Sequence, residues 1–332
     1  MSFAVINAVA DQAEAFTLSG SSCYETPIAN VPLIGHVFAE LAENGVERTV
    51  IIAPADVRRE LESVLEGGRS CGVEVAYSDV PEAAGHPTVL RETVQALADE
   101  PVLVYPADTL FPGQVAALRE RYSAGDVDCV LLGPSADVDQ RESPAAPAAV
   151  MLGPGTQEAL VDSPLSRGLT DPGLMEILVA AGCRVAVCEA TKHWRYDDST
   201  EGLLAANRMV LDALRVQSLA ATIRERNQIY GRVAISADAH VSNSTVYGPV
   251  VIDDDAVVVD SFVGPYTAIG RGAKVSGTEL DNCMVLPFAE VGYAGLRIEA
   301  SIIGERASVS RSFELPKGLH LRLTPGSRVT LS

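Results

Sequence analysis

Over the first two hundred residues, short apolar runs alternate with amphipathic stretches. Apolar runs of this length predict buried strands, and the amphipathic stretches predict helices. We expect strands at 3–9, 48–54, 73–79, 101–108, 128–134, 148–154 and 183–190, and helices at 33–45, 56–68, 87–99, 113–125 and 173–182. Alternation of this kind is typical of a parallel or mostly parallel sheet that is covered on both faces.

Two further stretches complete this half of the chain. Residues 134–148, PSADVDQRESPAAPA, are rich in Pro, Ala and Asp and predict a surface loop. Residues 200–226 carry a long helical pattern that leads out of the α/β region.

From Arg232 onwards the pattern becomes a repeat of aliphatic positions five or six residues apart. Every third member lies 17 residues from the next, as Ile235, Ile252 and Ile269 illustrate. The series is Ile235, Val241, Val246, Ile252, Val258, Val263, Ile269, Val275 and Leu280, and after one extra residue Ile298, Ile303 and Val309. Such a near-hexad repeat predicts a left-handed parallel β-helix, whose triangular coil turns one aliphatic side chain inward from each face.

The sequence therefore predicts a Rossmann-like α/β domain at 1–212, a linking helix at 213–230, and a left-handed β-helix with a C-terminal tail at 231–332. Hexad β-helices also occur in acyltransferases, which use a catalytic histidine between coils. His240 and His320 lie near the repeat, but neither has an evident carboxylate in sequence to orient it. We therefore interpret the β-helix as a structural scaffold for oligomerisation.

Charge and composition restrict the classes of partner. The net charge is −19, from 44 acidic and 25 basic residues, which disfavours binding to nucleic acid or an anionic membrane. No apolar run is long enough for a transmembrane helix, and residues 1–20 do not resemble a secretion signal. Six cysteines without CxxC spacing fit buried thiols in a reducing cytoplasm.

The basic residues are distributed unevenly. Of the 25, 22 are Arg and three are Lys, namely Lys192, Lys274 and Lys317. The first is Arg48, so the opening 47 residues contain no Lys or Arg. Any phosphate site built from that opening would therefore have no cationic side chain.

Four segments resemble sugar-1-phosphate nucleotidylyltransferases, above all the long form of glucose-1-phosphate thymidylyltransferase. They are PIANVPLIGHVFAELAENGVERTVII (27–52), VLVYPADTLFPG (102–113), HWRYDDSTEGLLAANRMVLD (193–212) and VYGPVVIDDDAVVVDSFVGPYTAIG (246–270). The resemblance implies a nucleotidyltransferase domain followed by a β-helix. It also implies the reaction of an NTP with a sugar 1-phosphate, which gives an NDP-sugar and diphosphate.

In the family, Mg²⁺, Lys, Arg and backbone N–H groups neutralise the phosphates during the in-line transfer. The family's first loop, G-G-x-G-T-R-L-R-P, aligns with this chain without a gap when PIANVP is the anchor. The glycines then fall on Ala8, Val9 and Asp11, the arginines on Ala13 and Ala15, and the lysine of a following P-K on Cys23. We therefore expect a degenerate phosphate loop, which would not hold a triphosphate in the family's way.

Other positions of the family site are partly retained. Pro81 matches the proline of the base-contacting stretch, while Ala83 replaces its glycine. Asp108 matches the aspartate of G-D-N, a metal ligand in the family. The second acidic ligand falls on Tyr196 in strict register, so Asp197 or Asp198 would have to replace it.

Four residues have competing interpretations. The acids Asp197 and Asp198 also suit the start of a helix at Glu201, and Trp194 suits packing. Cys23 is a candidate thiol without an evident base near it in sequence, so an inert cysteine is the alternative. Arg48 and Arg195 could bring positive charge to the site.

Two functions follow. In the first, the chain is a diverged homologue that lacks ordinary catalysis, and acts as a regulatory or structural partner or as a binder of a sugar phosphate or nucleotide-sugar. In the second, it is an active nucleotidylyltransferase that uses Mg²⁺ and an unusual sugar or cyclitol 1-phosphate from specialised metabolism. We expect a cytoplasmic homo-oligomer, or a hetero-oligomer with an active paralogue.

Overall fold

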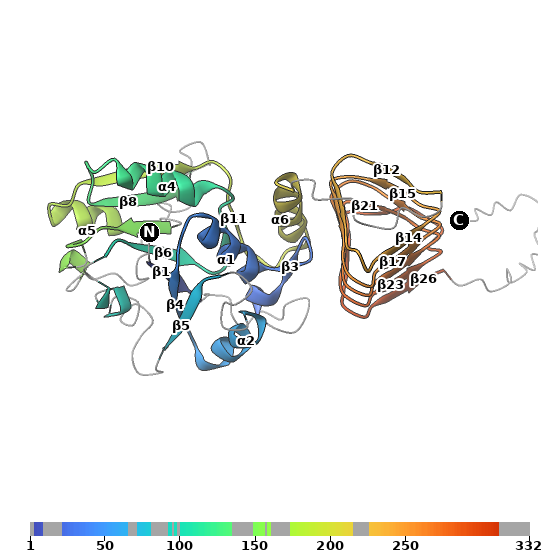
Figure 1. The fold of residues 1–332 in the computed structure, drawn as a ribbon, viewed down its shortest axis with the longest axis horizontal. Coiled ribbons are helices and arrows are strands. Elements are labelled where there is room, and N and C mark those ends of the chain that lie inside the picture. Colours follow the sequence, from blue (N-terminus) through green and yellow to red (C-terminus); the bar gives the residue numbers. More distant parts are fainter. Residues whose placement is uncertain are drawn as a thin grey trace, which may run out of the picture.

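The computed structural model describes residues 3–8, 22–65, 72–80, 92–94, 96–97, 100–134, 149–156, 158–160, 173–214 and 226–311. It has an α/β domain and a stack of parallel coils, with helix α6 (Thr200–Asp212) between them (Figure 1). Among the described residues, no helix combines the length and the apolar character needed to cross a membrane.

The α/β domain is built on a seven-stranded sheet in the order β10-β8-β9-β6-β1-β4-β5. The strands are β1 (Phe3–Asn7), β4 (Arg48–Ala53), β5 (Glu74–Asp79), β6 (Val102–Pro106), β8 (Cys129–Pro134), β9 (Ala149–Leu152) and β10 (Val185–Ala190). Only β9 among these seven is antiparallel to its neighbours. The expectation of a mostly parallel sheet is confirmed, and the antiparallel strand β9 makes the sheet mixed.

Alternation along β1 divides the core between the two faces of the sheet. Ala4 and Ile6 pack with residues of α1 (Leu33–Glu43), α2 (Ala55–Leu65) and α4 (Gln114–Ser123). Val5 belongs to the opposite cluster, which contains residues of α5 (Leu174–Ala180). The buried central strands are therefore apolar on both sides, as their sequences predict.

Several short elements were not predicted. A 3₁₀ turn covers Cys23–Glu25 and another covers Glu158–Leu160. Strands β2 (Pro27–Ile28) and β3 (Val31–Pro32) form a hairpin, and β7 (Thr109–Leu110) pairs antiparallel with β11 (Trp194–Arg195). Two-residue strands give no periodicity that a sequence pattern could reveal.

Three five-stranded parallel sheets form the β-helix, one along each side of the coil. Their strands are β12 (Gln228–Tyr230), β13 (Val233–Ile235), β14 (His240–Ser242), β15 (Thr245–Tyr247), β16 (Val250–Ile252), β17 (Val257–Val259), β18 (Phe262–Val263), β19 (Thr267–Ile269), β20 (Lys274–Ser276), β21 (Glu279–Asp281), β22 (Met284–Val285), β23 (Glu290–Gly292), β24 (Ile298–Glu299), β25 (Ile302–Ile303) and β26 (Ser308–Ser310). This confirms the β-helix that the repeat predicts.

The strand pairing explains the irregularity in the repeat. Val246 pairs with Val263 and Ile252 with Ile269, both at the expected spacing of 17 residues. Ile269 then pairs with Val285, one residue short, and Leu280 pairs with Ile298, one residue long. The coil therefore accommodates a deletion and an insertion at different corners, while the aliphatic side chains stay inside.

Side-chain hydroxyls line one corner of the coil. The backbone N–H of Ser261 donates to Ser244 Oγ at 3.1 Å, and that of Thr278 donates to Ser261 Oγ at 3.3 Å. These hydroxyls in turn donate to backbone carbonyls within their own turns. The ladder satisfies backbone donors that the bend removes from the strand hydrogen bonds.

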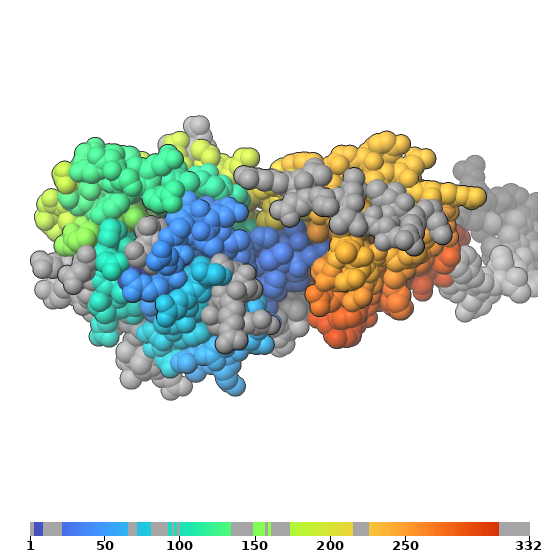
Figure 2. Space-filling view, viewed as in Figure 1, coloured from blue at the N-terminus to red at the C-terminus, as the bar shows by residue number. Residues whose placement is uncertain are grey.

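The β2–β3 hairpin connects the α/β domain to the β-helix. Ala29 and Asn30, at its tip, both have positive φ (46° and 69°), which a type I′ turn requires. Asn30 Nδ2 donates to the carbonyl of Ile269 in the β-helix at 2.8 Å. The blue surface of this segment meets the orange surface of the β-helix in Figure 2.

The domain boundaries remain a prediction. Helix α6 ends at Asp212, and β12 begins at Gln228. Residues 215–225, most of the expected linking helix, lie outside the described residues, as do residues 312–332 of the expected tail.

Candidate functional site

Two of the expected site residues lie at the carboxyl edge of the parallel strands. Ala8 follows β1 and its N–H donates to the carbonyl of Ile52, while Asp108 follows β6. The N–H of Ala107 donates to the carbonyl of Asn7 at 2.9 Å, which holds the two strand ends together. Ligands of open α/β sheets bind outside this edge.

The carboxylate of Asp108 has two partners in the protein. Its Oδ2 accepts a hydrogen bond from Arg195 Nε at 2.9 Å, and its Oδ1 accepts one from Thr109 Oγ1 at 2.9 Å. The Asp108 side chain is 10% exposed, whereas that of Arg195 is 63% exposed. The ion pair therefore buries its negative member and leaves most of its positive member in solvent.

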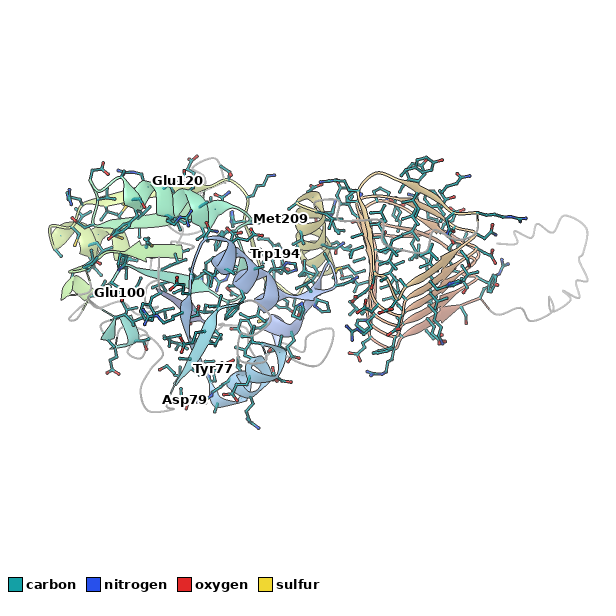
Figure 3. The ribbon with its side chains drawn as sticks, viewed as in Figure 1. Tyr77, Asp79, Glu100, Glu120, Trp194 and Met209 are labelled. Carbon is teal, nitrogen blue, oxygen red and sulfur yellow. The ribbon has the colours of Figure 1, made fainter. Side chains whose placement is uncertain are left out.

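Backbone pairing fixes this arrangement. Arg195 lies opposite Thr109 in the β7–β11 ladder, and the N–H of Tyr196 donates to the carbonyl of Asp108 at 2.9 Å. Trp194, which is buried, makes an edge-to-face contact with Tyr196 at a centroid distance of 6.1 Å. Trp194 lies between the α/β sheet and α6 in Figure 3, and its expected packing role matches this position.

The two adjacent acids after Tyr196 have other partners. Asp197 Oδ1 accepts hydrogen bonds from the N–H and the hydroxyl of Ser199, and Ser199 Oγ caps the N-terminus of α6 by accepting from Gly202 N. Asp198 Oδ1 accepts from the hydroxyl of Tyr196 at 2.7 Å. The helix-start interpretation of YDDST therefore agrees with the local hydrogen bonds.

Cys23 lies in the same part of the protein, buried in a 3₁₀ turn. Burial, followed by the charge of Asp108, raises the pKa of its thiol to about 12. Burial and the hydrogen bond to Asp198 likewise raise the pKa of Tyr196. Both groups are therefore neutral near pH 7. A cysteine side chain is never positively charged, so Cys23 cannot supply the charge of the lysine that the resemblance places at this position.

Within the described part of the chain, no three His, Cys, Asp or Glu side chains gather closely enough to hold a metal ion. Asp108, Asp197 and Asp198 are the expected metal ligands, and each has a hydrogen-bond donor from the protein. The remaining expected site residues, Val9, Asp11, Ala13, Ala15, Pro81 and Ala83, lie outside the described residues.

The two arginines that could bring charge to the site differ in position. Arg195 reaches Asp108, as described above. Arg48 is the first residue of β4, at the opposite edge of the sheet, where its guanidinium lies 3.7 Å from the ring centroid of Phe3 and pairs with Glu100. Sequence alone could not separate them, because the two-residue ladder that delivers Arg195 has no periodic signal.

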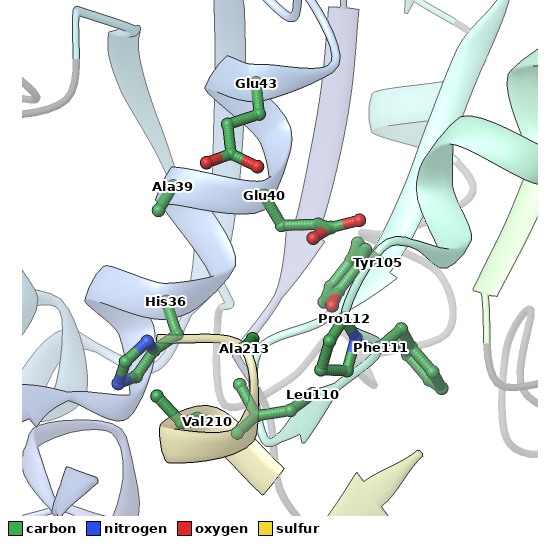
Figure 4. A pocket seen from close by; sticks show the side chains of 10 residues that line it. All are labelled: His36, Ala39, Glu40, Glu43, Tyr105, Leu110, Phe111, Pro112, Val210 and Ala213. Atoms are coloured by element: carbon green, nitrogen blue, oxygen red, sulfur yellow. The ribbon is translucent and has the colours of Figure 1, made fainter. Parts of the chain in front are cut away.

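A separate pocket of about 180 Å³ lies between α1, the segment after β7 and the end of α6 (Figure 4). Its lining includes His36, Glu40, Glu43 and Phe111. Glu40 accepts hydrogen bonds from the N–H groups of Gly113 and Val115, and burial raises its pKa. Two glutamates and no Lys or Arg in the lining make this pocket unsuitable for a triphosphate.

No protein-family model matches the chain. It is 24% identical over 333 residues to a glucose-1-phosphate thymidylyltransferase of Streptomyces antibioticus, and 26% identical over 336 residues to one of Streptomyces griseus; each alignment covers 92% of both chains. The chain is a homologue of sugar-1-phosphate nucleotidyltransferases. The chain is also 25% identical to the low-salt glycan biosynthesis nucleotidyltransferase Agl11 of Haloferax volcanii. That alignment covers 92% of this chain and 93% of Agl11.

A solved structure shares the fold. A Bacillus anthracis protein assigned as a glucose-1-phosphate thymidylyltransferase, in complex with a sucrose, superimposes on the homologue with a TM-score of 0.52 and 17% identity. The match covers 63% of this chain and 95% of that one. The nucleotidyltransferase fold that the sequence implies is therefore confirmed.

Proposed function

We propose that this nucleotidyltransferase homologue does not carry out ordinary metal-assisted nucleotidyl transfer. It would instead bind a sugar phosphate or a nucleotide-sugar, or support a partner protein. The observation that carries this proposal is the ion pair between Asp108 and Arg195, which occupies the carboxylate that the resemblance assigns to metal binding.

The charge of the chain supports the same proposal. Residues 1–47 contain no Lys or Arg, so no basic side chain of that segment could neutralise a triphosphate. Asp11 and Glu14 would face it in the family's register, and two like charges about 4 Å apart repel by roughly 4 kcal/mol at an intermediate dielectric.

The test incubates the full chain with Mg²⁺, each common NTP or dTTP, and a panel of sugar and cyclitol 1-phosphates, and measures release of pyrophosphate. Glucose 1-phosphate and dTTP come first, because two relatives are named for glucose-1-phosphate thymidylyl transfer. We expect no release above the protein-free control. The proposal would be contradicted by release of pyrophosphate that is abolished in Asp108→Asn. Asp128→Asn, at the opposite edge of the sheet, is the control and should leave such release intact.

The alternative is an active enzyme with an unusual sugar or cyclitol 1-phosphate as acceptor. Two observations favour this alternative. The chain aligns with 92% of the length of two relatives that are named as transferases, and Asp108 is present just after β6. An acceptor outside the common sugars would support this alternative if pyrophosphate release depended on both substrates.

We further propose that the chain forms an oligomer, either with itself or with an active paralogue. Tyr230 and Tyr247, at 46% and 43% exposure, stack on the outside of the β-helix with ring centroids 4.7 Å apart. Exposed aromatic pairs of this kind are common in interfaces. Light scattering of the purified chain tests the homo-oligomer, and co-purification with a paralogue tests the hetero-oligomer. The cytoplasmic location remains a prediction.

A further inference from the structure

We infer that Arg195 takes the place of the divalent cation at the carboxyl edge of the sheet. The site then excludes Mg²⁺ and binds a phosphate monoester directly through the guanidinium. This inference deepens the proposed function and rests on its premise that the site binds a sugar phosphate.

The donor set at this edge does not fit a divalent cation. A metal at Asp108 would lie close to the guanidinium of Arg195, whose Nε is 2.9 Å from the same carboxylate. Asp197 and Asp198 accept hydrogen bonds from Ser199 and Tyr196, and the side chain of Cys23 is buried. Mg²⁺ is usually held by one or two carboxylates together with waters and substrate phosphates, and here the carboxylate of Asp108 already pairs with a guanidinium.

The position of Arg195 is set by the backbone rather than by a flexible side chain alone. Its strand pairs with β7, directly after Asp108, and the N–H of Tyr196 binds the carbonyl of Asp108. Trp194, the residue before Arg195, is buried and packs the same strand against the core. The positive charge is therefore positioned as a fixed part of the fold, as a bound cation would be.

The exposure of the pair indicates the ligand. Asp108 is buried and Arg195 is mostly exposed, so solvent meets the positive end of the pair. A guanidinium presents N–H groups in a planar fork that matches two oxygens of a phosphate. One fixed cation suits a phosphate monoester better than a triphosphate, because residues 1–47 add no further positive charge.

Two measurements on the full chain test the two parts of this inference. Electron paramagnetic resonance of added Mn²⁺ measures metal binding, and we expect all of the Mn²⁺ to stay free at millimolar concentration. Isothermal titration with inorganic phosphate and glucose 1-phosphate measures anion binding. We expect equal affinity in EDTA and in Mg²⁺, and a loss of at least about tenfold in Arg195→Gln, the size of one charged hydrogen bond.

Arg184→Gln is the matched control. Arg184 pairs with Asp128 at 2.7 Å in the same way, but at the start of β8 and β10, at the other edge of the sheet. This variant should bind glucose 1-phosphate as the parent does. Arg195→Lys keeps the positive charge but lacks the planar guanidinium. It tests the inference if Arg195→Gln does not fold, and we expect it to bind glucose 1-phosphate at least several-fold more weakly than the parent protein.

Three outcomes would overturn the inference. Saturable Mn²⁺ binding that Asp108→Asn removes would return the site to metal binding. If glucose 1-phosphate binds only in the presence of Mg²⁺, or does not bind, Arg195 is not the anion-binding group. The same conclusion follows if Arg195→Gln and Arg195→Lys bind glucose 1-phosphate with the affinity of the parent protein. Pyrophosphate release is a separate readout, so failure of the proposed function is distinguishable from failure of this inference.

Discussion

Asn207 accepts a hydrogen bond from the backbone N–H of Ala29 at 3.0 Å, which ties helix α6 to the turn of the PIANVP segment. Its amide nitrogen donates to the carbonyl of Tyr266 in the β-helix at 2.9 Å. Asn207 is fully buried, so neither hydrogen bond is exchanged with water. The turn thus contributes to docking of the two domains.

Replacing Asn207 should therefore destabilise the junction. Asn207→Ala would leave the N–H of Ala29 and the carbonyl of Tyr266 without their partner. Each unsatisfied buried group costs about 1–3 kcal/mol, so we expect the free energy of unfolding to fall by about 2–4 kcal/mol. Urea denaturation followed by circular dichroism measures this change.

Arg208→Ala on the next, exposed position of α6 is the control for that experiment. It should change the free energy of unfolding by about 0.5 kcal/mol or less. Equal losses in Asn207→Ala and Arg208→Ala would mean that the junction does not depend on the Asn207 amide.

The Asp108–Arg195 pair should show energetic coupling. The pair is half buried, so its coupling should lie between that of exposed pairs and that of fully buried ones, at about 1–2 kcal/mol. A double-mutant cycle of Asp108→Asn and Arg195→Gln, followed by urea denaturation, measures it. Additive effects of the two substitutions would contradict the ion pair.

The hydroxyl ladder of the β-helix should contribute to its stability. Ser261→Ala removes the acceptor of the Thr278 N–H, which lies inside the coil, and should lower the free energy of unfolding by about 1–3 kcal/mol. Ser308→Ala on the exposed surface of β26 serves as the comparison. Thermal unfolding of both variants distinguishes the ladder from a general preference for serine.

The thiol of Cys23 should be unreactive in the folded protein. With its pKa raised from 9.0 to about 12, its thiolate fraction at pH 8 is about a thousandfold below that of an ordinary cysteine. Cys183, which is partly exposed, should react with iodoacetamide before Cys23, as mass spectrometry of the labelled peptides would show. Equal labelling rates would contradict the buried, neutral thiol.

The same shift has a consequence for stability at high pH. The folded pKa of Cys23 lies above the unfolded one, so its contribution is fully present below about pH 9 and is lost as the pH rises towards 12. Cys23→Ser should weaken this loss between pH 9 and 10.5, as urea denaturation at several pH values would measure. An unchanged pH dependence would indicate that other groups dominate it.

Much of the fold could be predicted from the sequence. The seven strands of the α/β sheet are short runs rich in apolar residues, and helices such as α1 and α2 have one apolar face, so these elements carry a signal in the sequence. The β-helix is encoded even more directly, because every coil repeats the same inward positions and Val246, Val263 and Leu280 stack in register. Local pattern and global fold agree in these elements.

The candidate site was predictable only in part. The absence of Lys and Arg from residues 1–47 could be read directly, because charge is a property of the sequence. The partner of Asp108 could not, because Arg195 is 87 residues away and reaches it through a two-residue ladder. The sequence by itself determined which charges are missing, and the tertiary structure decided where a remaining one lies, because a long-range ion pair depends on how strand ends meet in space.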